Sequence, residues 1–351
     1  MPAGINTRCN APWKKNSAGV SSRLDLALEA GTPSLPASGQ IAVFAPRDGY
    51  DLSALPKERC VIVTGFKPEF DRFEAAGFEC VTALESRVAM SVVCVPRAKA
   101  LAQGLVAQAA AMTDGPVIVD GAKTDGVEAI LKACRKRAEV SAALSKSHGK
   151  LFHFAAGTGF EDWLPQTGAP MAEGFVTAPG VFSADGVDPA SRLLADHLPA
   201  KLGARLADLG AGWGYLSARV LERESVQEVH LVEADHAALS CARANIDDSR
   251  AVFHWADAGH WSVETALDCV VMNPPFHTGR RAEPHIGQSF IRAAARLLHP
   301  KGQLFLVANR HLPYEGSLEQ SFSEVTDFGG DTRFKLLHAA RPKPGTRGRS
   351  G

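Results

Sequence analysis

Short apolar runs rich in β-branched residues alternate along this chain with longer segments of helical spacing. In the first half, such runs occupy residues 41–45, 60–65, 91–96, 116–121 and 150–156, and helical spacing between them is found at 67–76, 97–112 and 125–138. A short, almost wholly apolar run is typical of a parallel strand that is buried on both faces. The alternation therefore predicts an α/β domain with a mostly parallel sheet between two layers of helices.

The same alternation begins again near residue 205. Further strands are predicted at 205–210, 228–235, 251–257, 267–275 and 302–309, with helices at 213–223, 236–246 and 285–298. Helical residues near 315–323 precede two candidate strands, 324–328 and 332–340, which the turn FGGD joins. Such a hairpin would add an antiparallel strand at the sheet edge. The second half is therefore expected to form a seven-stranded, mostly parallel sheet that ends in this strand.

A length of 351 residues suits two domains. Residues 1–39 are rich in Pro, Gly, Ser and Ala and are expected to form a loose leader, followed by domains over 40–165 and 166–340. The Pro- and Gly-rich stretch 161–180 is the expected connection. Residues 341–351 carry four basic residues and no acidic one, and are expected to be a flexible basic tail.

Charge and cysteine content restrict the class of protein. Thirty-eight basic residues balance thirty-eight acidic ones, which excludes a chain-wide polycation that coats nucleic acid. Seven scattered cysteines without a CxxC pair predict reduced thiols, with neither a disulfide framework nor a metal site. No apolar run approaches the roughly 18 residues of a membrane span. We expect a soluble, cytoplasmic protein without a membrane partner.

The sequence DLGAGWG (208–214) follows an apolar strand and opens a helix. Gly210, Gly212 and Gly214 allow a sharp turn and a close approach of a ligand to the backbone. The spacing differs from the dinucleotide fingerprint GxGxxG and from the P-loop GxxxxGK[ST]. The pattern, which includes Asp208, resembles the first signature of S-adenosylmethionine-dependent methyltransferases with a Rossmann-like fold. A tight strand–helix turn without a ligand is the alternative.

Two acidic residues end the next two strands. Glu233 lies at the tip of the second strand, where a carboxylate can accept hydrogen bonds from both hydroxyls of a ribose. Asp257 ends the third strand and resembles the residue that contacts the adenine amino group in these methyltransferases, although a helix cap is an equally good interpretation.

The motif NPPF (273–276) follows the fourth strand. Pro274 and Pro275 fix the backbone and remove two donors, so the Asn273 side-chain oxygen and the Pro274 carbonyl can converge as acceptors for an exocyclic amine. That amine would attack the sulfonium methyl group in line, helped mainly by positioning and without a metal. Phe276 offers a face on which a base can stack. A rigid structural turn is the alternative.

Arg280 and Arg281 follow this motif directly. They are candidates for contacts with phosphates beside a flipped nucleotide, which would position RNA without reading its sequence. Solvated surface charges are the alternative.

With these motifs, the chain resembles the small-subunit rRNA guanine-N2 methyltransferase C family over about 179–340. The resemblance rests on GVFS (180–183), DLGAGWG, NPPFH (273–277), GQSFIRAAARLL (287–298), VANRHLPY (307–314) and RFKLLHAA (333–340). It implies two tandem Rossmann-like methyltransferase-type domains, with a degenerate first domain that helps folding and RNA binding. It also implies that residues 179–191, including Phe182, fold over the methionine end of the cofactor. The basic cluster KACRKR (132–137) is a possible RNA contact, with a solvated helix face as the alternative.

The resemblance implies methyl transfer from S-adenosylmethionine to the N2 amine of a guanine in 16S rRNA, within the small ribosomal subunit, by a monomer. Guanine N2 in large-subunit rRNA, adenine N6 and glutamine N5 remain as alternative acceptors. A non-catalytic RNA-binding assembly factor that retains the fold is an alternative of a different class.

Overall fold

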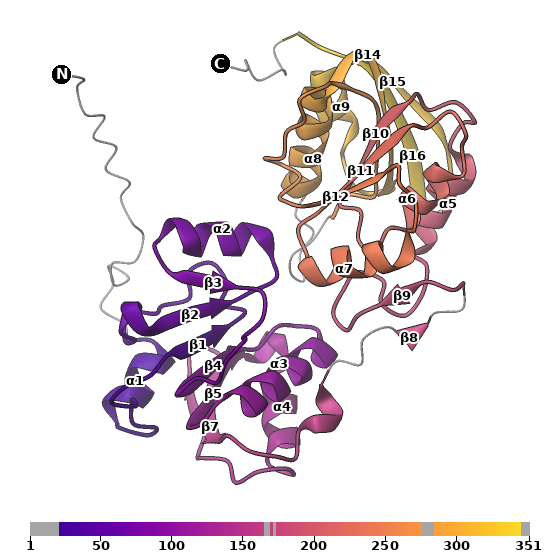
Figure 1. Cartoon of the computed structure of the whole chain (residues 1–351). Coiled ribbons are helices and arrows are strands. Elements are labelled where there is room, and N and C mark those ends of the chain that lie inside the picture. The colour runs from indigo at the N-terminus through magenta and orange to yellow at the C-terminus, as the bar shows by residue number, and fades with distance from the viewer. Residues whose placement is uncertain (1–20, 165–168, 171–172, 276–283, 345–351) are drawn as a thin grey trace, which may run out of the picture. The chain divides into compact units, whose positions relative to one another are not determined.

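The computed structural model describes residues 21–164, 169–170, 173–275 and 284–344. The chain divides into two units: Met1–Gly65 with Glu69–Pro165, and Phe66–Pro68 with Gln166–Gly351. Each unit contains a seven-stranded sheet of its own (Figure 1).

The first unit has a sheet with strand order β3-β2-β1-β4-β5-β7-β6. Its strands are β1 (Ile41–Phe44), β2 (Cys60–Val63), β3 (Glu79–Val81), β4 (Met90–Cys94), β5 (Pro116–Ala122), β6 (Leu144–Lys146) and β7 (Gly149–Ala155). Its helices are α1 (Arg23–Glu29), α2 (Lys67–Ala75), α3 (Lys99–Met112) and α4 (Val127–Cys134), with short 3₁₀ turns at Lys57–Arg59, Lys123–Asp125 and Glu161–Trp163. The strands from β3 to β5 are parallel, and β7 and β6 are antiparallel.

The expectation of a loose leader over 1–39 is wrong for its last part. Ser22 caps α1, because its hydroxyl accepts the Asp25 N–H at 3.0 Å and the Asp25 carboxylate accepts the Ser22 N–H at 2.8 Å. Leu24 and Ala27 are buried in the core beside β1 and β4. The seven-residue helix was missed because Pro, Gly and Ser dominate its surroundings. Residues 1–20 lie outside the described residues.

The second unit has the strand order β12-β11-β10-β13-β14-β16-β15. Its strands are β10 (Arg205–Leu209), β11 (Glu228–Glu233), β12 (Ala251–Trp255), β13 (Leu267–Met272), β14 (Leu298–Asn309), β15 (Phe322–Gly330) and β16 (Phe334–Pro342), besides the small pair β8 (Ala169–Pro170) and β9 (Val176–Thr177). Its helices are α5 (Pro189–His197), α6 (Tyr215–Leu221), α7 (His236–Asn245), α8 (Pro284–Leu297) and α9 (Glu315–Ser321). The strands from β12 to β14 are parallel, and β16 and β15 form the antiparallel hairpin.

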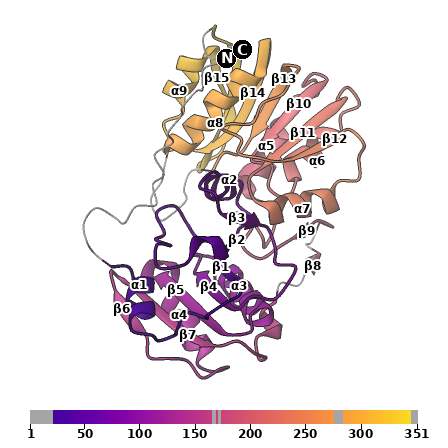
Figure 2. The ribbon, with the colours of Figure 1, turned by 60° about the vertical axis from the view of Figure 1, so that its left-hand side comes forward.

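Helices cover both faces of this second sheet. One core contains Leu194 of α5 and Val220 of α6, and the other contains Ile291 of α8 and Leu318 of α9. Figure 2 shows α8 and α9 on one side of the sheet and α5 to α7 on the other. Because successive residues of a strand point to opposite faces, both cores draw on the same apolar strands.

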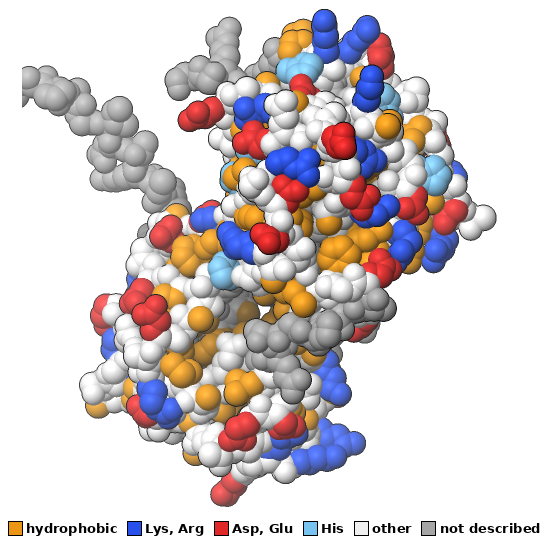
Figure 3. Space-filling model, turned by 45° about the vertical axis from the view of Figure 1, so that its right-hand side comes forward, with side chains coloured by type: hydrophobic (Ala, Val, Ile, Leu, Met, Phe, Trp, Pro, Cys, Tyr) orange, Lys and Arg blue, Asp and Glu red, His pale blue; other side chains and the backbone are white. Residues whose placement is uncertain are grey.

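The predicted fold class is therefore confirmed for both halves. Hairpin strand β16 runs to Pro342, so the expected tail begins later than residue 341, and residues 345–351 lie outside the described residues. The sequence analysis did not identify the short edge strands β3 and β6. Basic and acidic side chains are interspersed on the visible face of the second unit (Figure 3). In the described part of the chain, no helix is long and apolar enough to cross a bilayer.

Candidate functional site

The site is built at the carboxyl ends of the parallel strands of the second unit. After β10 the backbone turns through positive φ at Gly210 (75°), Gly212 (57°) and Gly214 (93°) before α6 begins. Only glycine adopts these angles at little cost. A Cβ on Gly212 would meet nothing within 4 Å, so this glycine faces open space.

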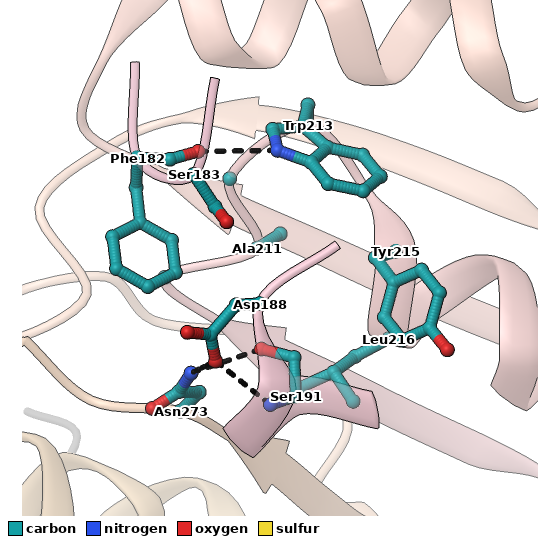
Figure 4. Close-up of a pocket in the computed structure, with 11 residues that line it drawn as sticks. Phe182, Ser183, Asp188, Ser191, Ala211, Trp213, Tyr215, Leu216 and Asn273 are labelled. Carbon is teal, nitrogen blue, oxygen red and sulfur yellow. Dashed lines mark hydrogen bonds between the residues drawn. The ribbon is translucent and has the colours of Figure 1, made fainter. Parts of the chain in front are cut away.

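A cavity lies against this glycine loop (Figure 4). The cavity is shallow and opens to solvent. The residues that line it come from the glycine loop, the start of α6, the segment before α5 and the end of β13. They are Phe182, Ser183, Asp188, Ser191, Gly210, Ala211, Gly212, Trp213, Tyr215, Leu216 and Asn273.

Asp208 lies beneath the loop and is not among the residues that line the cavity. Its side chain is fully buried, and its Oδ2 accepts a hydrogen bond from the Ser217 hydroxyl at 2.8 Å. Its Oδ1 is buried without a hydrogen-bond partner among the described residues. Burial raises the pKa of Asp208 from 3.8 to about 7, with a further contribution from the charge of Glu233. This carboxyl group links the end of β10 to α6.

Glu233 anchors the same loop from the end of β11. Its carboxylate accepts the Gly212 N–H and the Asp235 N–H, each at 2.8 Å. Burial raises the pKa of Glu233, and these two N–H groups oppose that shift. A carboxylate has about four acceptor positions, so these contacts do not use all of them. Glu233 is not among the residues that line the cavity.

The Asp257 side chain bonds groups in the turn that follows it. Its carboxylate accepts the Gly259 N–H at 2.8 Å and lies 2.7 Å from His260 Nδ1. Asp257 therefore stabilises a turn rather than the start of a described helix, and it is not among the residues that line the cavity.

The segment before α5 is tied to the glycine loop. The Trp213 indole Nε1–H donates to the Phe182 carbonyl at 3.1 Å. Asn245 of α7 adds a second link, because its Nδ2 donates to the carbonyls of Val176 at 2.9 Å and Trp213 at 2.8 Å. The Phe182 side chain, 59% exposed, stands at the cavity (Figure 4).

Asn273 follows β13 and lines the cavity from the opposite side. Its Nδ2 donates to Asp188 Oδ2 and to Ser191 Oγ, each at 2.9 Å. Its Oδ1 accepts no hydrogen bond from the described residues and points away from Asp188 in Figure 4. A Cβ on Gly210 would lie 4.0 Å from Pro275 Cδ, so the proline pair, Pro274 and Pro275, adjoins the glycine loop.

The structure thus brings together Phe182, the glycine loop and Asn273 around one cavity. Phe276, Arg280 and Arg281 lie outside the described residues.

Sequence reasoning missed the side chains that organise this cavity, namely Asp188, Ser191, Trp213 and Asn245. Asp188 followed by Pro189 is a helix-start signal that could have placed the cap of α5. Nothing in the sequence indicates that this cap also bonds Asn273, which is 85 residues away.

Comparison with known proteins agrees with this geometry. The model of the methyltransferase small domain family matches residues 173–338. Ribosomal RNA small subunit methyltransferase C from Shewanella sp. (strain MR-7) is 30% identical over 257 residues, which cover 70% of this chain and 75% of the relative.

Two other relatives match about half of the chain. Ribosomal RNA small subunit methyltransferase C from Hahella chejuensis is 36% identical over 47% of this chain and 48% of the relative. Ribosomal RNA large subunit methyltransferase G from Alcanivorax borkumensis is 34% identical over 47% of this chain and 44% of the relative. In these two matches the chain spans about half the length of the relative.

Among solved structures, the chain is similar to the T. thermophilus 16S rRNA N2 methyltransferase RsmC in complex with AdoMet and guanosine. The TM-score is 0.74 at 26% identity, and the match covers 88% of this chain and 90% of that chain.

Proposed function

Because the chain belongs to the ribosomal RNA small subunit methyltransferase C family, we propose that it transfers a methyl group from S-adenosylmethionine to the N2 amine of a guanine in 16S rRNA. The substrate is the rRNA of the small ribosomal subunit, and the enzyme acts in the cytoplasm as a monomer.

The residues at the cavity fit S-adenosylmethionine. The empty space over Gly212 and the neighbouring backbone of Ala211 and Trp213 allow a ligand to approach the chain closely. Glu233 retains acceptor positions for ribose hydroxyls, and Phe182 offers an exposed ring beside the cavity. Asp208 supports the loop without touching the ligand.

Methyl transfer requires an amine held in line with the donor. S-Adenosylmethionine supplies a methyl group on a positively charged sulfur: the amine lone pair forms the N–C bond while the C–S bond breaks, sulfur becomes neutral, and the amine then loses a proton. Asn273 Oδ1 and the Pro274 carbonyl accept the two N–H groups of the guanine amine and hold its nitrogen toward the donor. The proline pair keeps both acceptors rigid.

The observation that carries this proposal is the orientation of Asn273. Its amide lines the same cavity as the glycine loop and leaves Oδ1 uncommitted while both contacts of Nδ2 are occupied. An acceptor is what an aromatic amine needs, because it has two donors and little basicity.

The proposal is tested with the full chain, tritiated S-adenosylmethionine, and small and large ribosomal subunits that lack the modification. We expect N2-methylguanosine in 16S rRNA, identified by chromatography and mass analysis of the digested RNA. Asn273→Ala should lower the transfer rate about 10²–10³-fold, as for the loss of a preorganised polar group, with cofactor affinity unchanged. Arg97→Ala, in the exposed loop after β4, is the control and should leave the rate unchanged.

Other outcomes reject the proposal in distinct ways. Methyladenosine, which differs in mass, would move the acceptor to adenine N6. RNA that binds without acquiring label would indicate a non-catalytic assembly factor. An Asn273→Ala variant with the wild-type rate would remove Asn273 from the reaction.

Guanine in large-subunit rRNA is the second candidate substrate. It is supported by the 34% identity with a large subunit methyltransferase G over 47% of the chain, which is close to the 36% identity with a small subunit methyltransferase C over the same share of the chain. Label in 23S rather than 16S rRNA in the same assay would select it.

A further inference from the structure

Two side chains outside the predicted site determine which way the Asn273 amide faces. A carboxylate oxygen can only accept a hydrogen bond, so the neighbour of Asp188 Oδ2 at 2.9 Å must be the NH₂ end of the amide. Ser191 Oγ accepts from the same Nδ2 at 2.9 Å. With both N–H groups of Asn273 engaged on this side, Oδ1 is directed to the opposite side.

Asp188 and Ser191 are themselves held by the start of α5. Asp188 is the N-cap, and its Oδ2 accepts the Ser191 N–H at 2.8 Å. Pro189 occupies the first turn of this helix and fixes the backbone beside the cap. Ser191 is only 7% exposed, and Ala190 and Leu194 of the same helix are in the core. The two acceptors therefore belong to a rigid, packed element.

This arrangement affects how well Oδ1 accepts a hydrogen bond. An amide that donates to a charged acceptor is polarised, which increases the electron density on its oxygen. The same contacts prevent the amide from rotating, so no ordering is required when a substrate amine arrives. Both effects act on the proposed acceptor without any contact between Asp188 and the substrate amine.

We propose that Asp188 and Ser191 are positioning residues that hold the Asn273 amide with Oδ1 toward the substrate amine. This role rests on the proposed function, since it gives Asn273 its orientation for accepting an amine. The helix cap and the positioning of Asn273 share one carboxylate oxygen, and suitable variants separate them.

Asn and Ser cap helices about as well as Asp, so Asp188→Asn and Asp188→Ser retain the cap. The Ser hydroxyl is too short to reach Asn273, and the Asn amide reaches it without a charge. We expect the kcat of Asp188→Ser to fall about 10–100-fold and that of Asp188→Asn about 3–10-fold, as for the loss or weakening of a hydrogen bond to a charged group. Ser191→Ala should lower kcat by less, because the charged partner remains. Asp196→Asn, an exposed carboxylate on the same helix, is the matched control and should show the wild-type kcat.

Two measurements besides activity accompany these rates. The melting temperatures of the Asp188 variants should stay within about 2 °C of wild type, since the cap remains. Calorimetry should give an unchanged Kd for S-adenosylhomocysteine but a weaker Kd for guanosine added to that complex. In a double-mutant cycle, Asp188→Ser should have no further effect on kcat in an Asn273→Ala chain, because Asp188 acts through Asn273.

Three results would overturn the positioning role. Wild-type kcat in Asp188→Ser would show that Asn273 needs no such support. A weaker Kd for S-adenosylhomocysteine with unchanged kcat at saturating cofactor would make Asp188 a cofactor ligand. Equal losses of kcat in the wild-type and Asn273→Ala backgrounds would make the role of Asp188 independent of Asn273.

If the wild-type chain methylates an acceptor other than 16S rRNA, the proposed substrate is wrong and the same variants are compared on that acceptor. A chain that neither transfers methyl groups nor binds guanosine overturns both proposals.

Discussion

The two units have the same strand order, yet the carboxyl ends of their central strands are built differently. In the second unit β10 is followed by three glycines with positive φ, and β13 is followed by Asn273 and two prolines. In the first unit β1 is followed by Ala45, Pro46 and a tyrosine-containing loop, and β4 by Val95 and Pro96. The backbone topology alone therefore does not make a ligand site.

Side chains occupy the corresponding edge of the first unit. Asp120 of β5 is paired in register with Cys94, the last residue of β4. Its carboxylate, 4% exposed, accepts from Arg23 Nε at 2.6 Å and from the Tyr50 hydroxyl at 3.0 Å. In the second unit the residue level with the end of β13 is the buried, apolar Leu306. We propose that the first unit replaces a ligand by a buried ion pair and serves folding and RNA binding.

The largest effect should follow from breaking this ion pair. Asp120→Ala leaves Arg23, 16% exposed, without its charged partner and Tyr50 without its acceptor. We expect the free energy of unfolding of the first unit to fall by about 3 kcal/mol, as for a buried pair that loses one member. Amide hydrogen exchange in the full chain reports each unit separately.

Asp114→Ala is the control, because its pair with Arg87 is exposed and worth less than about 1 kcal/mol. Equal losses in the two variants would contradict a structural role for Asp120. A loss of cofactor affinity without a loss of stability would indicate that the first unit has a ligand role after all.

Much of this comparison could be predicted from the sequence. Apolar runs of five to nine residues identified the central strands of both sheets, because strands buried on both faces have no polar alternation to obscure them. The edge strands β3 and β6, three residues each, and the capped helix α1 were missed. Such short elements are stabilised by tertiary contacts, such as that of Arg23 with Asp120, rather than by local pattern.

The candidate functional site could be predicted from the sequence to a similar extent. The glycine loop, Phe182 and Asn273 line the cavity, because each follows a local motif at the end of a strand or before a helix. Asp208 belongs to the same motif but is not among the residues that line the cavity, and its carboxyl group bonds Ser217. A motif predicts which residue types occur, but it does not determine whether a carboxylate faces the cavity or the interior of the protein. The Asp188–Asn273 contact joins residues far apart in sequence and needed the fold.

The buried carboxyl group of Asp208 should make the stability of the second unit depend on pH. The pKa of Asp208 is about 7 in the folded chain against an ordinary value of 3.8. The folded state therefore binds more protons than the unfolded state between about pH 4 and pH 7, and stability falls as pH rises through this range. Relative to Asp208→Asn, the wild-type second unit should lose about 2 kcal/mol of unfolding free energy between pH 5 and pH 7.

Exchange protection factors measured at pH 5, 6 and 7 test this difference. The first unit serves as an internal control, since β1 consists of four buried apolar residues without an ionisable group. A wild-type chain whose pH dependence matches that of Asp208→Asn would show that Asp208 is ionised well below pH 7.

Matched glycine substitutions compare the two loops more directly. Gly212 (φ 57°) and Gly49 (φ 76°) both have positive φ, and neither would bring a Cβ within 4 Å of another group. Each substitution by alanine should therefore lower the free energy of unfolding by about 1 kcal/mol, because the backbone conformation is strained for a residue with a Cβ. Only Gly212 lines the cavity, so Gly212→Ala should also weaken the binding of S-adenosylhomocysteine. We expect its Kd, measured by calorimetry, to rise about tenfold, because the added methyl group occupies space that the ligand needs. Similar cofactor affinity in both variants would exclude the loop from the binding surface.

The smallest expected effect separates the units by RNA binding. Lys132, Arg135 and Lys136, on α4 and directly after it, are exposed, whereas Arg137 is committed to Asp162 at 2.6 Å. If these three exposed charges contact phosphates, changing them together to Gln should weaken rRNA binding about threefold and reduce the salt dependence of affinity by up to about one counterion per lost contact.

The kcat at saturating RNA should not change in this triple variant, because the residues that we propose for the reaction are in the second unit. Lys201→Gln with Lys301→Gln neutralises exposed charges of the second unit and is the control for a non-specific loss of charge. A salt slope that falls by an equal amount per charge in both variants would make the helix face of α4 an ordinary solvated surface. A steeper fall for the α4 variant would assign RNA contacts to the unit that has no glycine loop.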